Sequence, residues 1–136
     1  PVQGRRQFWD DFAAGVDGRM LYSNIRWSED VFEKNWSGGG NFLGCTIYPS
    51  PEGLAKSIRW EALRDGLEDY DYLFLLRRAL EGYEGEGRTD ASDAAAAARK
   101  IVNNDALMAT VSTPDELLAR RKEVGNLIEK LNARPE

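Results

Sequence analysis

The fold of this chain is decided by residues 57–76, which read SIRWEALRDGLEDYDYLFLL. Successive residues of an α-helix are rotated by about 100°, and on that period most of the apolar residues share one half of the helix. These are Ile58, Ala62, Leu63, Gly66, Leu67, Tyr70, Leu73 and Phe74. Arg59 and Asp69 also fall in this half, whereas Trp60, Tyr72 and Leu75 fall in the polar half. We therefore expect a helix that is covered on two sides and holds an ionic group inside.

The inward position of Asp69 requires a partner, because an unpaired buried charge is costly. The sequence offers Arg59, or the backbone of a neighbouring element, and we predict a structural ion pair between Arg59 and Asp69. The remaining carboxylates, Asp65, Glu68 and Asp71, fall on the outer face beside Arg64. A catalytic acid–base pair is the alternative interpretation of this cluster. Because Arg64 and Glu68 have the spacing of a surface ion pair, a structural role is favoured.

The composition excludes several classes of function. The chain has 136 residues and a net charge of −5, which argues against binding to nucleic acid or to an anionic membrane. No apolar run reaches the roughly 20 residues that cross a bilayer. The chain has no histidine and a single cysteine, Cys45, so we expect no metal site and no cofactor. The compartment stays open, exported or cytoplasmic, because Pro1 is not a natural initiator and a removed export signal leaves no trace.

The first half of the chain predicts a helix, a strand and a long loop. The helix is expected over residues 5–14 and a short strand over 19–22. An irregular segment follows from 23 to about 51, with a turn at 49–53. Loops of this length are uncommon and are usually functional or disordered, and several aromatic residues argue against disorder here.

The second half of the chain predicts three helices. The helix that starts near Ser57 should end at about Leu80, followed by a glycine-containing connector up to Arg88. A helix with an alanine run is expected over 89–103. Thr113-Pro114-Asp115-Glu116 has the pattern of a capping box and predicts the start of the last helix.

The order helix, strand, long loop, helix is typical of the last units of a β/α barrel. A complete barrel needs about 250 residues. We therefore predict a mainly α chain with one or two short strands, the C-terminal fragment of a (β/α)8 barrel plus a helical appendix. Residues 1–81 would be the barrel part, 82–88 a linker and 89–136 the appendix. In the helix that closes the barrel, the residues expected to face a strand are Ile58, Gly66, Tyr70 and Leu73.

The loop aromatics are the better candidates for function. Trp27, Trp36 and Tyr48 follow the expected strand, and in β/α folds the segment after a strand lies on the catalytic face. Flat aromatic rings suit the apolar faces of sugars, and a neighbouring amide such as that of Asn24 can bond their edges. The alternative, equally weighted, is that these rings only hold a long loop together.

Tyr48-Pro49, a glycine-containing turn and the helix over 57–73 resemble the C-terminal part of glycoside hydrolase family 123 and its uncharacterised relatives. Residues 18–22 are similar to the family's strand, and Trp27 and Trp36 to its loop tryptophans. The resemblance extends from about residue 18 to 131, but only the part from Tyr48 to Leu76 is specific. The chain departs from the family in the loop: Ser23 stands where the family has tryptophan, a Gly-Asp-Gly motif is absent, and Ser50 replaces the glycine after Tyr-Pro.

The resemblance implies a retaining β-N-acetylgalactosaminidase-like enzyme on a β/α barrel. It implies substrate-assisted catalysis, in which an Asp orients the 2-acetamido group and an adjacent Glu is the acid/base. That pair belongs to an earlier strand, so no catalytic residue is assigned to this chain. The expected partner is a carbohydrate with an N-acetylhexosamine, together with a second copy of the chain or a preceding barrel segment. The residues expected to contact the sugar are Tyr22, Asn24, Trp27, Trp36 and Tyr48.

A competing hypothesis is a non-catalytic helical interaction or accessory domain. The alanine run at residues 94–98 and the capped last helix fit it well. In either case we expect the isolated chain to be inactive.

Overall fold

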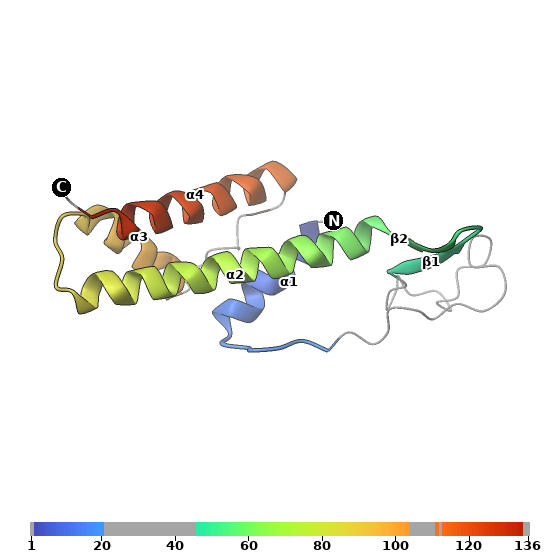
Figure 1. Cartoon of the computed structure of the whole chain (residues 1–136), viewed down its shortest axis with the longest axis horizontal. Coiled ribbons are helices and arrows are strands. Elements are labelled where there is room, and N and C mark those ends of the chain that lie inside the picture. The colour runs from blue at the N-terminus through green and yellow to red at the C-terminus, as the bar shows by residue number, and fades with distance from the viewer. Residues whose placement is uncertain (1, 21–45, 104–110, 112, 135–136) are drawn as a thin grey trace.

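The computed structural model describes residues 2–20, 46–103, 111 and 113–134 of the chain. Figure 1 shows one long helix, α2, as the spine, with the other helices packed along it and two strands at one end. The expected class, mainly helical with two short strands, is confirmed. The elements are, in chain order, α1 (Val2–Ala13), β1 (Ile47–Ser50), β2 (Gly53–Lys56), α2 (Ile58–Gly85), α3 (Ser92–Val102) and α4 (Pro114–Asn132).

Helix α2 begins where the sequence predicts and ends later. The Ser57 hydroxyl accepts hydrogen bonds from the backbone N–H groups of Arg59 and Trp60, at 3.2 and 3.4 Å. The expected end at about Leu80 is wrong, because α2 continues to Gly85 and includes Gly82 of the expected connector. Tyr83 is buried in the core, and its packing holds the last turns in place although two glycines weaken them.

Helix α4 confirms the predicted capping box. The backbone N–H of Glu116 donates to the Thr113 hydroxyl at 3.3 Å, and the backbone N–H of Thr113 donates to the Glu116 carboxylate at 3.0 Å. Pro114 occupies the first turn, where its missing N–H costs nothing.

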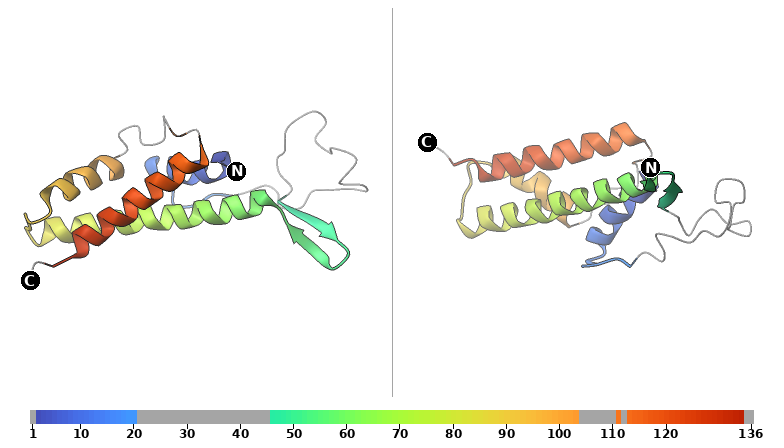
Figure 2. Two further views of the ribbon diagram at one scale, coloured as in Figure 1. Left: turned by 90° about the horizontal axis from the view of Figure 1, so that it is seen from above. Right: turned by 45° about the vertical axis from the view of Figure 1, so that its right-hand side comes forward.

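The strands lie at different positions from the one expected. β1 and β2 form an antiparallel hairpin in which Tyr48 pairs with Ala55, and the predicted turn at 49–53 is the tip of this hairpin. Arg19 and Met20, the described part of the strand expected over 19–22, are not in a strand. Arg19 instead donates two hydrogen bonds to Asp11, at 2.6 and 2.7 Å. Figure 2 shows the hairpin extending beyond the N-terminal end of α2.

Helix α1 covers the side of α2 that was expected to face a barrel strand. Phe8 lies against Gly66, and the Phe12 and Tyr70 rings meet edge to face with centroids 5.6 Å apart. The Tyr70 hydroxyl donates to the backbone carbonyl of Val16 at 3.1 Å. The side of α2 that was expected to face a barrel strand is therefore covered by α1, a helix of the same chain. Ile58, at the start of α2, is mostly exposed.

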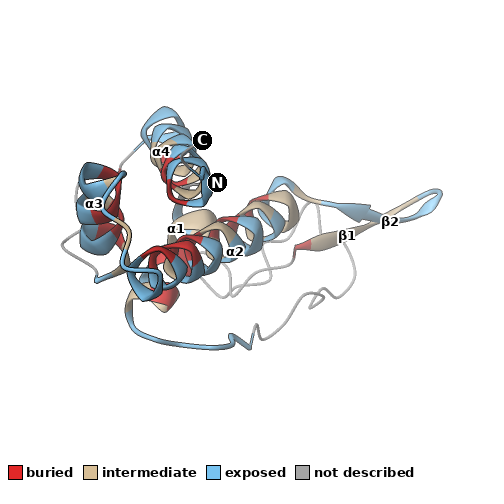
Figure 3. Cartoon of the chain, turned by 60° about the vertical axis from the view of Figure 1, so that its left-hand side comes forward, coloured by how far each residue is buried: buried red, intermediate tan, exposed pale blue. Residues whose placement is uncertain are grey.

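Helices α3 and α4 cover a second side of α2, as expected from its pattern. Ala94, Ala95 and Ala98 are buried, and their small side chains let α3 approach α2 closely. Figure 3 shows the buried residues of these helices turned toward one another. Of the apolar residues in the polar half of the helix, Tyr72 is half-buried against α4, but Leu75 stays about half exposed. One core thus includes residues from α1, α2, α3 and α4.

The contact between Gly66 and Phe8 gives a first prediction. A Cβ atom at Gly66 would lie 2.2 Å from Phe8 Cδ2, so the Gly66→Ala variant must displace the ring or α1. We expect a loss of about 1–3 kcal/mol of stability, measured as a lower Tm. The matched control is Gly82→Ala, where a Cβ meets nothing within 4 Å and should stabilise the helix slightly. Equal Tm values for the two variants would contradict the packing described here.

Candidate functional site

The structure describes one of the five residues expected to contact a sugar. Tyr48 lies on β1 and is half-buried, opposite Ala55 of β2. Tyr22, Asn24, Trp27 and Trp36 lie outside the described residues. Their assignment to a sugar site stays a prediction.

The carboxylate of Asp69 is the most confined charged group among the described residues. Its side chain is 0% exposed. Arg5 of α1 binds it with two hydrogen bonds, from Nε to Oδ2 at 3.0 Å and from Nη2 to Oδ1 at 2.8 Å. Trp9 Nε1 donates to Oδ2 at 3.1 Å, and Arg121 Nη1 of α4 lies 3.4 Å from Oδ1. Oδ2 therefore accepts two hydrogen bonds, and Oδ1 accepts one hydrogen bond and has an ion-pair contact with Arg121.

Arg121 connects α4 to α2 through three contacts. Its Nη2 donates to Glu68 at 2.9 Å, and its guanidinium lies 4.8 Å from the centre of the Tyr72 ring. Burial works against the charge of Arg121, but the hydrogen bond to Glu68 and the charge of Asp69 raise its pKa above the usual value. Arg121 therefore stays protonated and serves as a permanent cation beside Asp69.

The expectation that Asp69 is buried and paired is confirmed, but the partner expected for it is corrected. Arg59 is exposed, and its position along α2 is about 15 Å from that of Asp69, too far for two side chains of one helix to meet. The partners are Arg5, Trp9 and Arg121, which sequence reasoning missed. Arg5 and Trp9 are separated by one helical turn of α1 and therefore lie on the same face of it. That spacing was the feature of the sequence from which a shared contact could have been predicted.

The outer carboxylates of α2 form a network of surface ion pairs. Arg64 contacts Glu61, Asp65 at 2.9 Å and Glu68 at 3.8 Å. Asp65 also lies 3.9 Å from Arg5 Nη1. Each of these carboxylates is thus held in at least one ion pair on the surface of the helices. The arrangement supports a structural role for this cluster.

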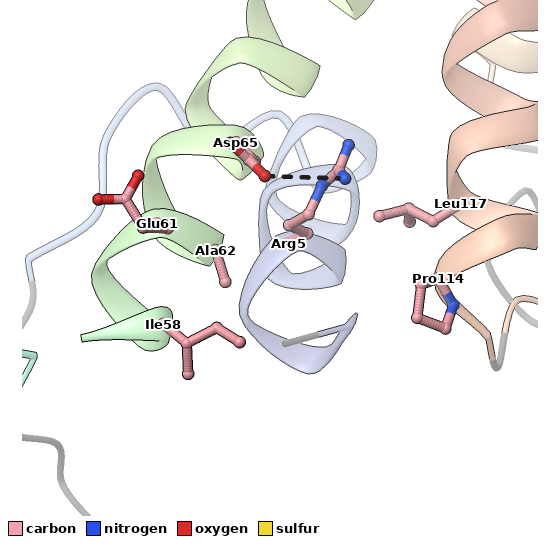
Figure 4. Close-up of a pocket in the computed structure, with 7 residues that line it drawn as sticks. All are labelled: Arg5, Ile58, Glu61, Ala62, Asp65, Pro114 and Leu117. Atoms are coloured by element: carbon pink, nitrogen blue, oxygen red, sulfur yellow. Dashed lines mark ion pairs between the residues drawn. The ribbon is translucent and has the colours of Figure 1, made fainter.

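A hollow of about 230 Å³ lies beside this network. Figure 4 shows the side chain of Arg5 in it, directed toward Asp65. Its volume is below the 300 Å³ or so at which ligand pockets begin, and its charged groups, Arg5, Glu61 and Asp65, are all held in ion pairs. We therefore assign no ligand to it. It is lined by Arg5, Ile58, Glu61, Ala62, Asp65, Pro114 and Leu117.

The described part of the chain contains neither a metal-binding cluster nor a membrane-spanning helix. There, no three side chains of the metal-binding types gather closely enough to hold a metal ion. None of the described helices combines the length and the apolar character needed to cross a membrane.

The burial of Asp69 generates a second prediction. In the Asp69→Asn variant, Arg5 and Arg121 lose their shared counter-charge inside the protein. We expect a loss of roughly 3–5 kcal/mol, measured by chemical denaturation. The control is Asp71→Asn on the same helix, an exposed position where the expected change is within about 0.5 kcal/mol. A stability equal to that of the unmodified chain would show that Asp69 does not hold the helices together.

Comparison with known proteins assigns the chain to a family. Residues 3–76, more than half of the chain, match the model of the glycoside hydrolase 123 catalytic domain. No curated protein and no solved structure matches the chain. The matched segment includes α1, the hairpin and α2 as far as Leu76, and so contains Arg5, Trp9 and Asp69. On this match, the chain belongs to the glycoside hydrolase 123 catalytic-domain family.

Proposed function

We propose that this chain is the C-terminal portion of a retaining β-N-acetylgalactosaminidase-like hydrolase. In it, α1, the hairpin and α2 would belong to the last units of a (β/α)8 barrel, and residues 89–136 would be a helical appendix. The observation that carries the proposal is the match of residues 3–76 to a glycoside hydrolase catalytic domain. That match supports a hydrolase-related function and a carbohydrate substrate. That the carbohydrate contains an N-acetylhexosamine is our more specific proposal.

The catalytic carboxylates would come from outside this chain. In the proposed reaction the substrate's acetamido oxygen attacks the anomeric carbon, an Asp orients that group, and a Glu protonates the leaving oxygen. Two carboxylates of α2 that could imitate such a pair, Glu68 and Asp69, both face Arg121. Their carboxylate groups are engaged by that guanidinium, which supports a structural role for both. This supports a division in which α2 is the barrel-closing helix and the chemistry lies elsewhere.

The sugar contacts would come from the segment before α2. Tyr48 is on the hairpin that leads into α2, and the hairpin is joined to the start of that helix because Ser57 N–H donates to the Thr46 carbonyl at 2.9 Å. We propose that Tyr48, with Tyr22, Asn24, Trp27 and Trp36, lines the sugar site. An aromatic ring there would cover the apolar face of the sugar, while Asn24 would bond its edge.

The alternative is a non-catalytic interaction domain. The observation that favours it is an apolar side of α2 that no described helix covers, with Leu67 57% and Phe74 46% exposed. An uncovered apolar surface of this kind is typical of a protein contact.

The division of roles predicts that the 136-residue chain alone is inactive. We expect no release of aryl alcohol from an aryl N-acetyl-β-galactosaminide above the uncatalysed rate. The measurement is an absorbance assay at high enzyme concentration, with a longer protein that contains this segment as the positive control. A rate that follows the concentration of the isolated chain would refute the proposal that the catalytic carboxylates lie outside it.

The sugar-site assignment predicts the effect of removing the rings. In the longer active protein, Trp27→Ala and Tyr48→Ala should each raise KM or lower kcat by about tenfold or more, at unchanged Tm. Tyr48→Phe retains the ring and is the matched control, with a smaller kinetic change. If the alanine variants lower only Tm, these rings hold the loop together and do not contact the sugar.

A further inference from the structure

The turn after α2 places Arg88 beside the end of α4. Helix α2 ends in a Schellman-type turn, in which Gly87 has a positive φ of 65° and the N–H of Arg88 donates to the Tyr83 carbonyl at 3.3 Å. The Arg88 guanidinium lies 5.0 Å from the centre of the Tyr83 ring, and the Tyr83 hydroxyl accepts from the N–H of Ala91 at 3.1 Å. Because Tyr83 is buried in the core, these contacts fix the position of Arg88 relative to α2.

Arg88 binds the C-terminal end of α4 with directional hydrogen bonds. Its Nη1 donates to the Leu131 carbonyl at 2.7 Å, and its Nη2 donates to the Ala133 carbonyl. The last carbonyls of a helix have no partner within that helix, so Arg88 satisfies groups that would otherwise depend on water. Asp90 holds the guanidinium in this orientation, because it accepts from Nε at 3.0 Å and from Nη2 at 2.6 Å. Arg88 thus connects the end of α2 to the end of α4.

A second polar contact between α2 and α4 lies nearer the middle of both helices. Arg121 of α4 lies 3.4 Å from Asp69 and donates to Glu68 at 2.9 Å. Leu131 lies ten residues after Arg121, which is about 15 Å along a helix. Figure 1 shows α4 running in the same direction as α2, so the contacts of Arg121 and Arg88 restrain α4 at two separate points of its length.

We propose that Arg88 is a positioning residue for α4: it fixes the place of this helix along α2 and thereby keeps Arg121 beside Asp69. A slip of α4 by one residue would move it about 1.5 Å along its axis. The donor–acceptor distance of a hydrogen bond varies by only about 0.5 Å, so such a slip would break the bonds of Arg88 and displace Arg121 from Asp69. Apolar contacts tolerate that displacement better, because they are non-directional.

This role connects two parts of the chain that the family match separates. Arg88 and Arg121 lie outside residues 3–76, whereas Asp69 lies within them. The part of the chain beyond the match therefore controls the surroundings of a buried carboxylate inside it. This proposal goes beyond the proposed hydrolase function and does not depend on it. The alternative is a local role, in which Arg88 caps the last carbonyls of α4 and has no effect on Arg121.

A double-mutant cycle on the 136-residue chain distinguishes these roles. Arg88→Met and Arg121→Met each remove a guanidinium and retain an apolar stem, and chemical denaturation gives the unfolding equilibrium constant of each variant. Sites about 15 Å apart that share no partner normally act independently. If Arg88 positions Arg121, the fold-change of the double variant should be smaller than the product of the single fold-changes by a factor of at least about three.

The matched control is the cycle of Arg99→Met with Arg121→Met. Arg99 of α3 pairs with Glu84 of α2, so it connects the same region of α2 to α3 rather than to α4. In this cycle the double variant should agree with the product of the single fold-changes within about twofold.

The indole N–H of Trp9 gives a second measurement. It donates to Asp69 Oδ2 at 3.1 Å and therefore reports on the environment of that carboxylate. In the proton–nitrogen correlation spectrum of the isotope-labelled chain, Trp9→Phe identifies this resonance. Arg88→Met should shift the Trp9 resonance and speed its hydrogen exchange, as Arg121→Met should, whereas Arg99→Met should do neither.

A coupled cycle together with a shifted Trp9 resonance would support the positioning role. An additive cycle, or a Trp9 resonance that Arg88→Met leaves unchanged, would overturn the proposal and leave Arg88 as a local cap of α4. If the double variant does not fold, the Trp9 resonance of the single Arg88→Met variant decides between the two roles.

Discussion

The carboxylate of Asp69 lies fully buried where α1, α2 and α4 meet, and this position constrains the whole helical assembly. Taking a carboxylate out of water costs several kcal/mol, and only close, well-oriented cations offset that cost. Arg5 supplies two parallel hydrogen bonds, and Arg121 supplies a second charge from the other side. A shift of α1 or α4 along α2 would remove one of these partners. Asp69 therefore sets the position of both helices, while apolar packing supplies most of the stability.

The contacts of Asp69 show that the packed structural unit extends beyond the segment that matches the family. The family match ends at Leu76, in the middle of α2, whereas Arg121 and Tyr83 belong to the rest of the chain. Arg121 nonetheless completes the environment of Asp69, and Tyr83 is buried in the core shared with α1 and α3. α3 and α4 are thus part of the same core as the matched segment. Their loss would remove Arg121 and leave Asp69 with Arg5 and Glu68 with Arg64 as the remaining cations.

The sequence predicted the features that depend on neighbouring residues. The start of α2 near Ser57, the Thr113 capping box and the inward position of Asp69 follow from patterns within a few residues, and all are present. The partner of Asp69 could not be found in this way, because Arg5 lies 64 residues away in the chain. Helical period shows which face of α2 is apolar, but it cannot show whether a strand or α1 covers that face. The hairpin was missed because Pro49 is unusual in a strand. Both strands of this two-stranded hairpin are edge strands, which tolerate a proline, and Pro51 lies in the turn between them.

The candidate site, too, depends on contacts between residues that are distant in the sequence and so could not be predicted from local patterns. Tyr48 could be proposed from its place before a helix, and the structure places it on a hairpin joined to the start of α2. The charged run that resembles a catalytic cluster is neutralised by Arg5, Arg64 and Arg121, which come from three different helices. Only the assembled structure shows that neutralisation. It also shows that α1 and α4 each cover one side of α2, while Leu67 and Phe74 on a third side stay about half exposed. These exposed apolar side chains are the part of α2 that the rest of the proposed hydrolase domain would cover.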